Sequence, residues 1–159
     1  MTRLLSLGLD GANWESIEDL PNLAALVEDG ATGDLRSVTP PVTCPAWRSS
    51  TSGKNPGKLG VYWWLDFDRE DGELTTPDAR SFDTADVWDY LSDGGYRCGI
   101  VNVPMTFPPA PIDGTMVSGF GAPFDLEIPG SITHPPEFEE RLDEYDWRVS
   151  VDDVTTSDG

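Results

Sequence analysis

The chain has 159 residues, of which 38% are hydrophobic and 10% aromatic, so it has enough apolar material to bury a core and is not that of a disordered protein. Twenty-nine acidic and ten basic residues give a formal net charge of −19, which argues against general binding to nucleic acid polymers or anionic membranes. The acidic residues are spread along the chain, and multimolar salt would screen their repulsion. We therefore expect a halophilic cytoplasmic protein, with an ordinary acidic enzyme as the alternative.

The first elements expected along the chain are a strand, a helix and a second strand. Residues 3–9 are almost continuously apolar, which predicts a buried strand of a parallel sheet with Asp10 at its carboxyl end. An apolar stripe over residues 20–30 predicts a helix. Residues 35–38 are a candidate for a short strand. These three elements are the expected beginning of an α/β domain.

The next segment is dominated by proline, glycine and aromatic residues. A short helix is predicted over residues 46–52, with Thr43 at or just before its N-cap and Pro45 in its first turn. Residues 53–60 are dense in turn formers and predict a loop. An aromatic patch and an acidic loop follow over residues 61–80.

The second half of the chain again alternates between helix and strand patterns. The expected elements are a helix starting at Asp83 or Thr84 and ending at Gly94, strands at 97–103 and 115–120, and an amphipathic helix at 135–145. The whole order predicts an α/β fold in which helices flank a mostly parallel sheet.

Two side chains of different chemistry are expected at one edge of that sheet. Asp10 and Thr43 each follow a predicted strand, and loops that follow parallel strands meet at the carboxyl edge. A carboxylate and a hydroxyl can hold a divalent metal ion, and a metal-bound threonine hydroxyl is an activated nucleophile. The backbone N–H of Cys44, at the helix start, can point at an anion. This combination indicates phosphoryl or sulfuryl transfer.

The charge pattern supports an anionic substrate at the same place. Residues 35–65 contain no acid but four basic side chains, including both lysines of the chain, Lys54 and Lys58. A basic segment in an acidic protein can steer a small phosphate ester. We expect these lysines to face solvent and to contribute weakly to substrate binding.

Seven short motifs follow one another along the chain, at residues 7–11, 21–23, 39–47, 52–57, 87–91, 102–109 and 117–120. In this order they resemble the N-terminal part of the type I phosphodiesterase/nucleotide pyrophosphatase family, within the alkaline phosphatase superfamily. Within this family the sequence is most similar to the group of phosphohydrolases and phosphomutases. The resemblance implies an incomplete alkaline phosphatase-like α/β domain over residues 1–148, followed by a truncated or disordered tail at 149–159.

The resemblance also implies roles for individual residues. Thr43 matches the metal-bound nucleophile, which forms a phospho-threonine intermediate, and Asp10 matches the first metal-binding aspartate. The implied cofactors are divalent ions, zinc or else manganese. The backbone N–H of Cys44 would help to hold the phosphate.

The sequence departs from the family in ways that limit these expectations. The family's other metal ligands include several histidines in its second half, whereas this sequence has one histidine, His134, at a position where the family has no ligand. Trp64 stands where nucleotide pyrophosphatases carry an asparagine that contacts phosphate, which does not support that activity.

We therefore expect a fragment that is inactive alone and has its second half elsewhere, as a separate chain. The alternative is a non-catalytic remnant that acts as a binding or interaction module. Sulfatase chemistry is disfavoured, because Cys44-Pro45-Ala46-Trp47-Arg48 has the wrong spacing for the modified-cysteine motif.

Overall fold

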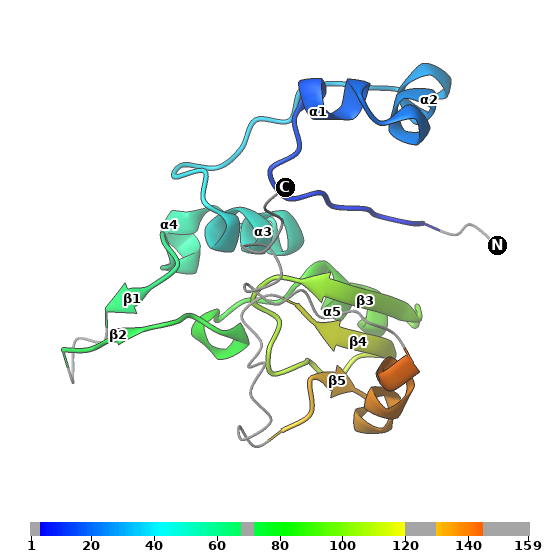
Figure 1. Cartoon of the computed structure of the whole chain (residues 1–159). Coiled ribbons are helices and arrows are strands. Elements are labelled where there is room, and N and C mark those ends of the chain that lie inside the picture. The colour runs from blue at the N-terminus through cyan, green and yellow to red at the C-terminus, as the bar shows by residue number, and fades with distance from the viewer. Residues whose placement is uncertain (1–3, 68–71, 120–129, 145–159) are drawn as a thin grey trace, which may run out of the picture. The chain divides into compact units, whose positions relative to one another are not determined.

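A computed structural model of the chain describes residues 4–67, 72–119 and 130–144 (Figure 1). The chain divides into two compact units, Met1–Ser37 and Val38–Gly159, each held together by its own contacts. The tail expected at 149–159 lies outside the described residues.

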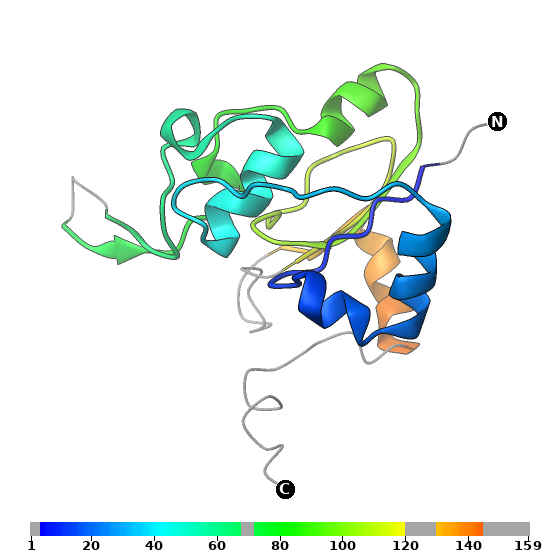
Figure 2. The same ribbon diagram turned by 90° about the horizontal axis from the view of Figure 1, so that it is seen from above.

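The first unit contains a pair of short helices, α1 (Trp14–Glu18) and α2 (Pro21–Asp29), which pack side by side (Figure 2). The side chain of Asn13 caps α1 by accepting the N–H of the third helical residue at 2.9 Å. The Trp14 indole N–H donates to Asp34 at 2.8 Å and so ties α1 to the segment that leaves α2. The helix predicted over residues 20–30 is confirmed.

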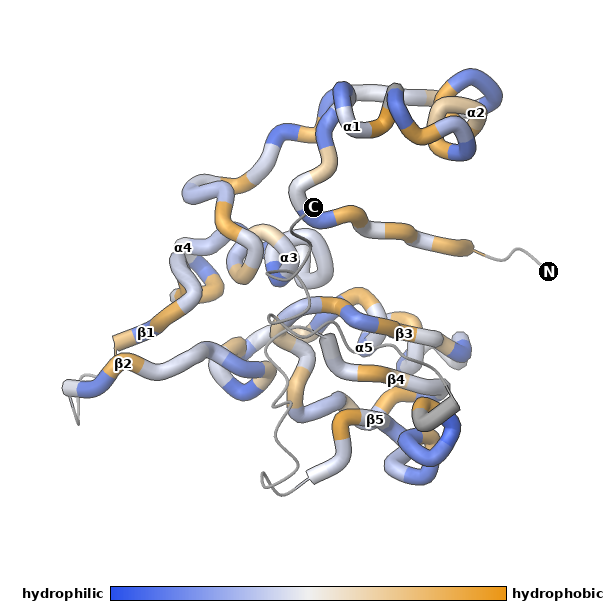
Figure 3. Tube along the Cα trace, viewed as in Figure 1, coloured by the Kyte–Doolittle hydropathy of each residue, from blue (hydrophilic) through white to orange (hydrophobic). Residues whose placement is uncertain are grey.

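The two strands predicted in this unit are wrong. Residues 4–9 and 35–38 carry no strand, and Leu4, Leu5 and Leu35 are 90%, 85% and 95% exposed. Figure 3 shows the apolar run of residues 4–9 along this part of the trace. A strand is stable only when a neighbour satisfies its backbone N–H and C=O groups, and no described segment pairs with either of these. An apolar run alone is therefore not sufficient for a strand.

The second unit is built on a three-stranded sheet in the order β3–β4–β5. Its strands are β3 (Cys98–Val103), β4 (Gly114–Ser118) and β5 (Thr133–His134). The strands predicted at 97–103 and 115–120 are thus confirmed over residues 98–103 and 115–118, and they pair in parallel. Strand β5 pairs antiparallel with β4, so the described sheet is mixed rather than mostly parallel. Together with the helices it is consistent with an α/β fold.

The remaining elements of this unit surround the sheet or precede it. They are α3 (Thr43–Ser52), α4 (Pro56–Leu59), the ribbon of β1 (Asp66–Phe67) and β2 (Leu74–Thr75), the 3₁₀ helix η1 (Ala79–Ser81), α5 (Val87–Asp93) and the 3₁₀ helix η2 (Pro136–Glu144). The predicted helix near residue 83 begins later than expected, because Asp86 is its N-cap. The helix expected at 135–145 forms, but with the tighter 3₁₀ geometry.

Two main clusters of buried side chains include a residue of β3 or of the segment that directly follows it. One joins α5 to the sheet through Trp88, Ile100, Ile112 and Met116. The other contains Cys44, Leu59, Val61, Phe82 and Met105. Because Met105 follows the end of β3, this second cluster places the first turn of α3 beside the carboxyl end of a parallel strand. Ligand sites of α/β sheets form at such ends.

Candidate active site

Helix α3 begins at Thr43, three residues earlier than the predicted 46–52. Val42 is the N-cap, so Thr43 is the first helical residue rather than the capping one. The first turn closes through the N–H of Ala46, which donates to the Val42 carbonyl at 2.9 Å. Pro45 fits here because the third N–H of a helix has no partner within the helix. No side chain caps this end.

Cys44 directly follows Thr43 and is completely buried. Its thiol belongs to the cluster that also contains Phe82 and Met105, which supports the interpretation of this side chain as packing. Its backbone N–H lies in the first turn of α3, where the helix dipole favours an anion. Trp64 packs against the same cluster, so the residue that replaces the family's asparagine is part of the core here.

The two lysines lie in the loop predicted at 53–60, which contains the short helix α4. Gly53 ends α3 in the left-handed conformation, with φ of 68°. Asn55 caps α4 by accepting the N–H of Lys58 at 3.0 Å. Lys58 is exposed and Lys54 is half-buried. This agrees with the expectation of solvent-facing loop residues for Lys58, and less well for Lys54.

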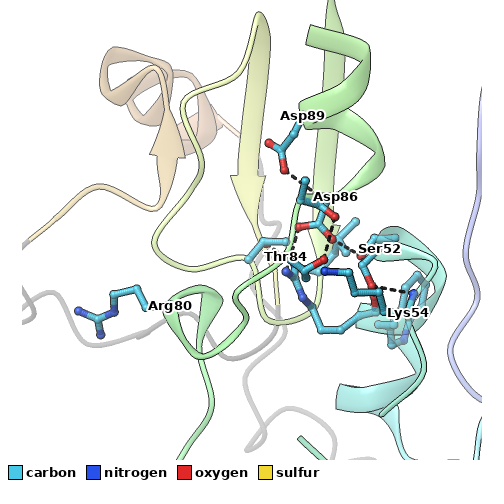
Figure 4. Close-up of polar contacts among 12 residues, drawn as sticks. Ser52, Lys54, Arg80, Thr84, Asp86 and Asp89 are labelled. Atoms are coloured by element: carbon cyan, nitrogen blue, oxygen red, sulfur yellow. Dashed lines mark hydrogen bonds and ion pairs between the residues drawn. The ribbon is translucent and has the colours of Figure 1, made fainter. Parts of the chain in front are cut away.

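A buried ion pair, which the sequence did not reveal, lies behind the candidate nucleophile. The Arg48 guanidinium Nη2 is 2.9 Å from Asp86 Oδ2, and these side chains are 3% and 6% exposed. The Thr51 hydroxyl donates to the other oxygen, Asp86 Oδ1, at 2.7 Å. Arg48 also lies over the Phe82 ring, with 4.5 Å from its central carbon to the ring centroid. Figure 4 shows Asp86 between Asp89 and the residues of α3.

The spacing of residues along α3 could have indicated that Arg48 is buried. Cys44, Arg48 and Thr51 stand at i, i+4 and i+7 and therefore share one face of α3. Since Cys44 is buried, that face points inward and needs an acidic partner for Arg48. The sequence alone does not reveal which carboxylate supplies it.

The electrostatics of Asp86 reflect this burial. Burial raises the pKa of Asp86, and the nearby Asp89 carboxylate acts in the same direction. The Thr51 hydroxyl and the Arg48 guanidinium oppose the shift, but the pKa stays above its ordinary value. Ionisation of Asp86 therefore lowers the free energy of unfolding.

Asp10 lies at the exposed turn that follows the apolar run of residues 4–9, beside Gly11 with φ of 69°. It belongs to the unit Met1–Ser37, whereas Thr43 belongs to the unit Val38–Gly159. Their expected proximity stays a prediction.

The donor set for a metal is incomplete in the described part of the chain. Among residues 4–67, 72–119 and 130–144, no group of three or more histidine, cysteine, aspartate or glutamate side chains could hold a metal ion. His134 is in β5 and half-buried. The residues present therefore do not by themselves fit the pair of ions that the resemblance implies.

None of the described helices is both long enough and apolar enough to cross a bilayer.

Comparison with known proteins gives one clear match. The sequence model of the type I phosphodiesterase / nucleotide pyrophosphatase family matches residues 4–158. No curated protein and no solved structure matches. Because the family match spans nearly the whole sequence and includes the segment around Thr43, the chain belongs to the type I phosphodiesterase / nucleotide pyrophosphatase family.

Proposed function

We propose that the chain carries the nucleophile of a metal-dependent phosphoric ester hydrolase, and that this nucleophile is Thr43. Family membership implies phosphoester hydrolysis of the phosphodiesterase or pyrophosphatase type. The observation that carries the proposal is the place of Thr43, at the first residue of α3, next to Cys44 in the cluster at the carboxyl end of β3. The acid-free segment around it favours a small anionic substrate.

The reaction at Thr43 is a covalent displacement at phosphorus. The Thr43 oxygen forms a bond to phosphorus while the bond from phosphorus to the leaving alcohol breaks, and the hydroxyl proton passes to solvent. The first-turn backbone N–H groups of α3 stabilise the negative charge on the phosphoryl oxygens. Lys54 and Lys58 contribute steering rather than direct contact.

Asp10 and Thr43 are the proposed oxygen ligands of a divalent ion, zinc or else manganese, which would supply Lewis acid chemistry. Two ligands do not complete a site of the family's type, and the chain has a single histidine. We therefore propose that further ligands come from outside these residues and that these 159 residues alone do not sustain turnover.

A labelling experiment tests the nucleophile. The chain is incubated with bis-p-nitrophenyl phosphate and zinc or manganese in high salt, and adducts are located by peptide mass spectrometry. We expect no more than one p-nitrophenolate per chain, with the adduct on Thr43. Thr43→Ala should abolish the adduct, and Ser50→Ala, an exposed hydroxyl on the same helix, should not.

The same experiment separates the alternatives. Sustained turnover that depends on Thr43 would contradict the proposed inactivity of the chain alone. The absence of any adduct would remove Thr43 as nucleophile. That result would favour the second candidate function, a non-catalytic binding or interaction module. The incomplete donor set of the described residues is the observation that favours this candidate.

We also propose that the distributed acidity adapts the chain to high salt. The free energy of unfolding should then rise between dilute and multimolar KCl, because screening removes the self-repulsion of a net charge of −19. Urea titrations at several salt concentrations measure this, and a flat or falling dependence would contradict it.

A further inference from the structure

Helix α3 carries two functional groups on different parts of its length. Thr43 stands at its first residue, and Arg48 follows five residues later, about 7.5 Å along the helix axis. Arg48 is buried, and its Nε has no hydrogen-bond partner among the described residues. Its guanidinium therefore contacts Asp86 through one edge only, at 2.9 Å.

Asp86 links α3 to the sheet through a series of direct contacts. Its carboxylate holds Arg48 and Thr51, and its backbone N–H donates to Asp89 Oδ2 at 2.7 Å at the start of α5. Trp88, the second residue of α5, lies in the buried cluster with Ile100 of β3. Asp86 thus adds a polar link between the sheet and α3 to the apolar contacts of Cys44.

We propose that the Arg48–Asp86 pair positions Thr43, fixing the rotation of α3 about its axis and the placement of its first turn at the carboxyl end of β3. Two directional contacts to the two oxygens of one carboxylate define an orientation that apolar packing alone does not. Arg48 and Asp86 are positioning residues and take no part in the bond changes at phosphorus. The inference rests on the proposed role of Thr43 for its catalytic meaning.

A stability role alone does not account for the pair. Burial raises the pKa of Asp86, so the ionised carboxylate costs free energy in the folded chain. A buried ion pair with an unpartnered donor is weaker than an apolar contact of similar size. The variant Asp86→Asn keeps the size of the side chain and removes its charge, and therefore separates positioning from stability.

Hydrogen exchange of the full chain, followed by NMR in high salt, provides the first test. In Asp86→Asn we expect the N–H groups of Ala46 and Trp47 to exchange at least tenfold faster, while those of β3 and β4 keep their wild-type rates. A purely structural role would accelerate exchange in α3 and in the two strands together. The matched control is Arg80→Gln, which breaks the more exposed ion pair with Asp78 and should leave both sets unchanged.

Thr51→Val provides a second variant that removes the hydroxyl bond to Asp86 and keeps the ion pair. We expect the same selective effect on Ala46 and Trp47, but smaller. If Asp86→Asn fails to fold, this variant decides the question. Unchanged exchange in α3, or equal acceleration in the sheet, overturns the inference.

The rate of Thr43 labelling by bis-p-nitrophenyl phosphate is the second readout. In Asp86→Asn we expect it to fall at least tenfold at a saturating concentration of the probe, with the same affinity for zinc. Selective exchange in α3 with no labelling of the wild type would support positioning and overturn the proposed nucleophile. Wild-type labelling that is unaffected by Asp86→Asn would overturn positioning and leave the nucleophile in place.

Discussion

Two of the arginine–aspartate pairs among the described residues differ in almost everything except their chemistry. Arg48 and Asp86 are 3% and 6% exposed and connect two helices that are far apart in sequence. Arg80 and Asp78 are 75% and 21% exposed and lie two residues apart around η1. Solvent screens the second pair and cannot screen the first. An arginine–aspartate pair therefore joins two distant helices in one place and supports a local helix cap in the other.

The two aspartates also respond to their surroundings in opposite directions. Burial raises the pKa of Asp86 despite its arginine. Partial burial opposes the ionisation of Asp78, but hydrogen bonds and charge from Arg80 outweigh it and lower the pKa of Asp78. The charge and hydrogen bonds of the arginine thus outweigh burial at Asp78 but not at Asp86.

The largest expected effect is that of Arg48→Met. It leaves the Asp86 carboxylate buried without its counter-charge, which costs about 3–5 kcal/mol of the free energy of unfolding. Urea unfolding of wild type and variant measures the difference. A double variant, Arg48→Met with Asp86→Leu, should recover part of the loss. Equal stability of Arg48→Met and wild type would contradict the buried pair.

Thr51→Val should have the next largest effect. The valine has the shape of threonine but cannot donate to Asp86, so one bond to a buried charged group is lost, at about 1–3 kcal/mol. The same urea titration measures it. Ser50→Ala, whose hydroxyl lies on the exposed side of α3, is the matched control and should be close to neutral. If both variants lose the same free energy of unfolding, the hydrogen bond to Asp86 contributes no more to stability than the exposed hydroxyl of Ser50.

The pH dependence should distinguish the two aspartates by sign. Because the folded pKa of Asp86 is raised, its contribution to stability is present below the ordinary value of 3.8 and is lost as pH rises through the raised value. Asp86→Asn should remove this loss, so that its stability relative to wild type increases across that window. Asp86→Asn also leaves the Arg48 guanidinium without its counter-charge at every pH, a cost that the contact with the Phe82 ring offsets in part.

Asp78 should show the opposite dependence. Its folded pKa is lowered, so its contribution is present above 3.8 and is lost as pH falls through the lowered value. Urea midpoints of Asp78→Asn and Asp86→Asn, measured against wild type from acid to neutral pH, check both signs. Parallel curves for the two variants would remove the contrast between the pairs.

The smallest expected effect is that of Arg80→Gln. Its side chain is exposed, so the charge is screened and the long side chain gains freedom when the pair is broken. We expect no measurable change in the urea midpoint in high salt. A clear fall of the urea midpoint in high salt would mean that exposed ion pairs stabilise this chain more than a screened pair is expected to.

The sequence predicted those elements whose signals are local. Strands β3 and β4 were predicted at residues 97–103 and 115–120, and α2 and α5 follow from apolar stripes with recognisable ends. The apolar run of residues 4–9 gave the same signal without forming a strand, because pairing depends on a neighbour that a local pattern does not contain. The beginning of α3 was placed too late because prolines near its start hid the first turn.

For the candidate site, the sequence pointed to the proposed nucleophile, Thr43, but not to the ion pair of Arg48 and Asp86. Thr43 lies in a dense local motif, whereas Arg48 and Asp86 are far apart in sequence and each resembles an ordinary surface residue. Only the fold brings them together. The pairing of Asp10 with Thr43 depends in the same way on contacts between distant segments.

The most direct measurement of the central claim is the location of the covalent adduct after incubation with bis-p-nitrophenyl phosphate and zinc or manganese. We expect an adduct on Thr43 that disappears in Thr43→Ala. The adduct should form at least tenfold more slowly in Asp86→Asn and at the wild-type rate in Ser50→Ala. An adduct on another residue, or none in the wild-type chain, would contradict it.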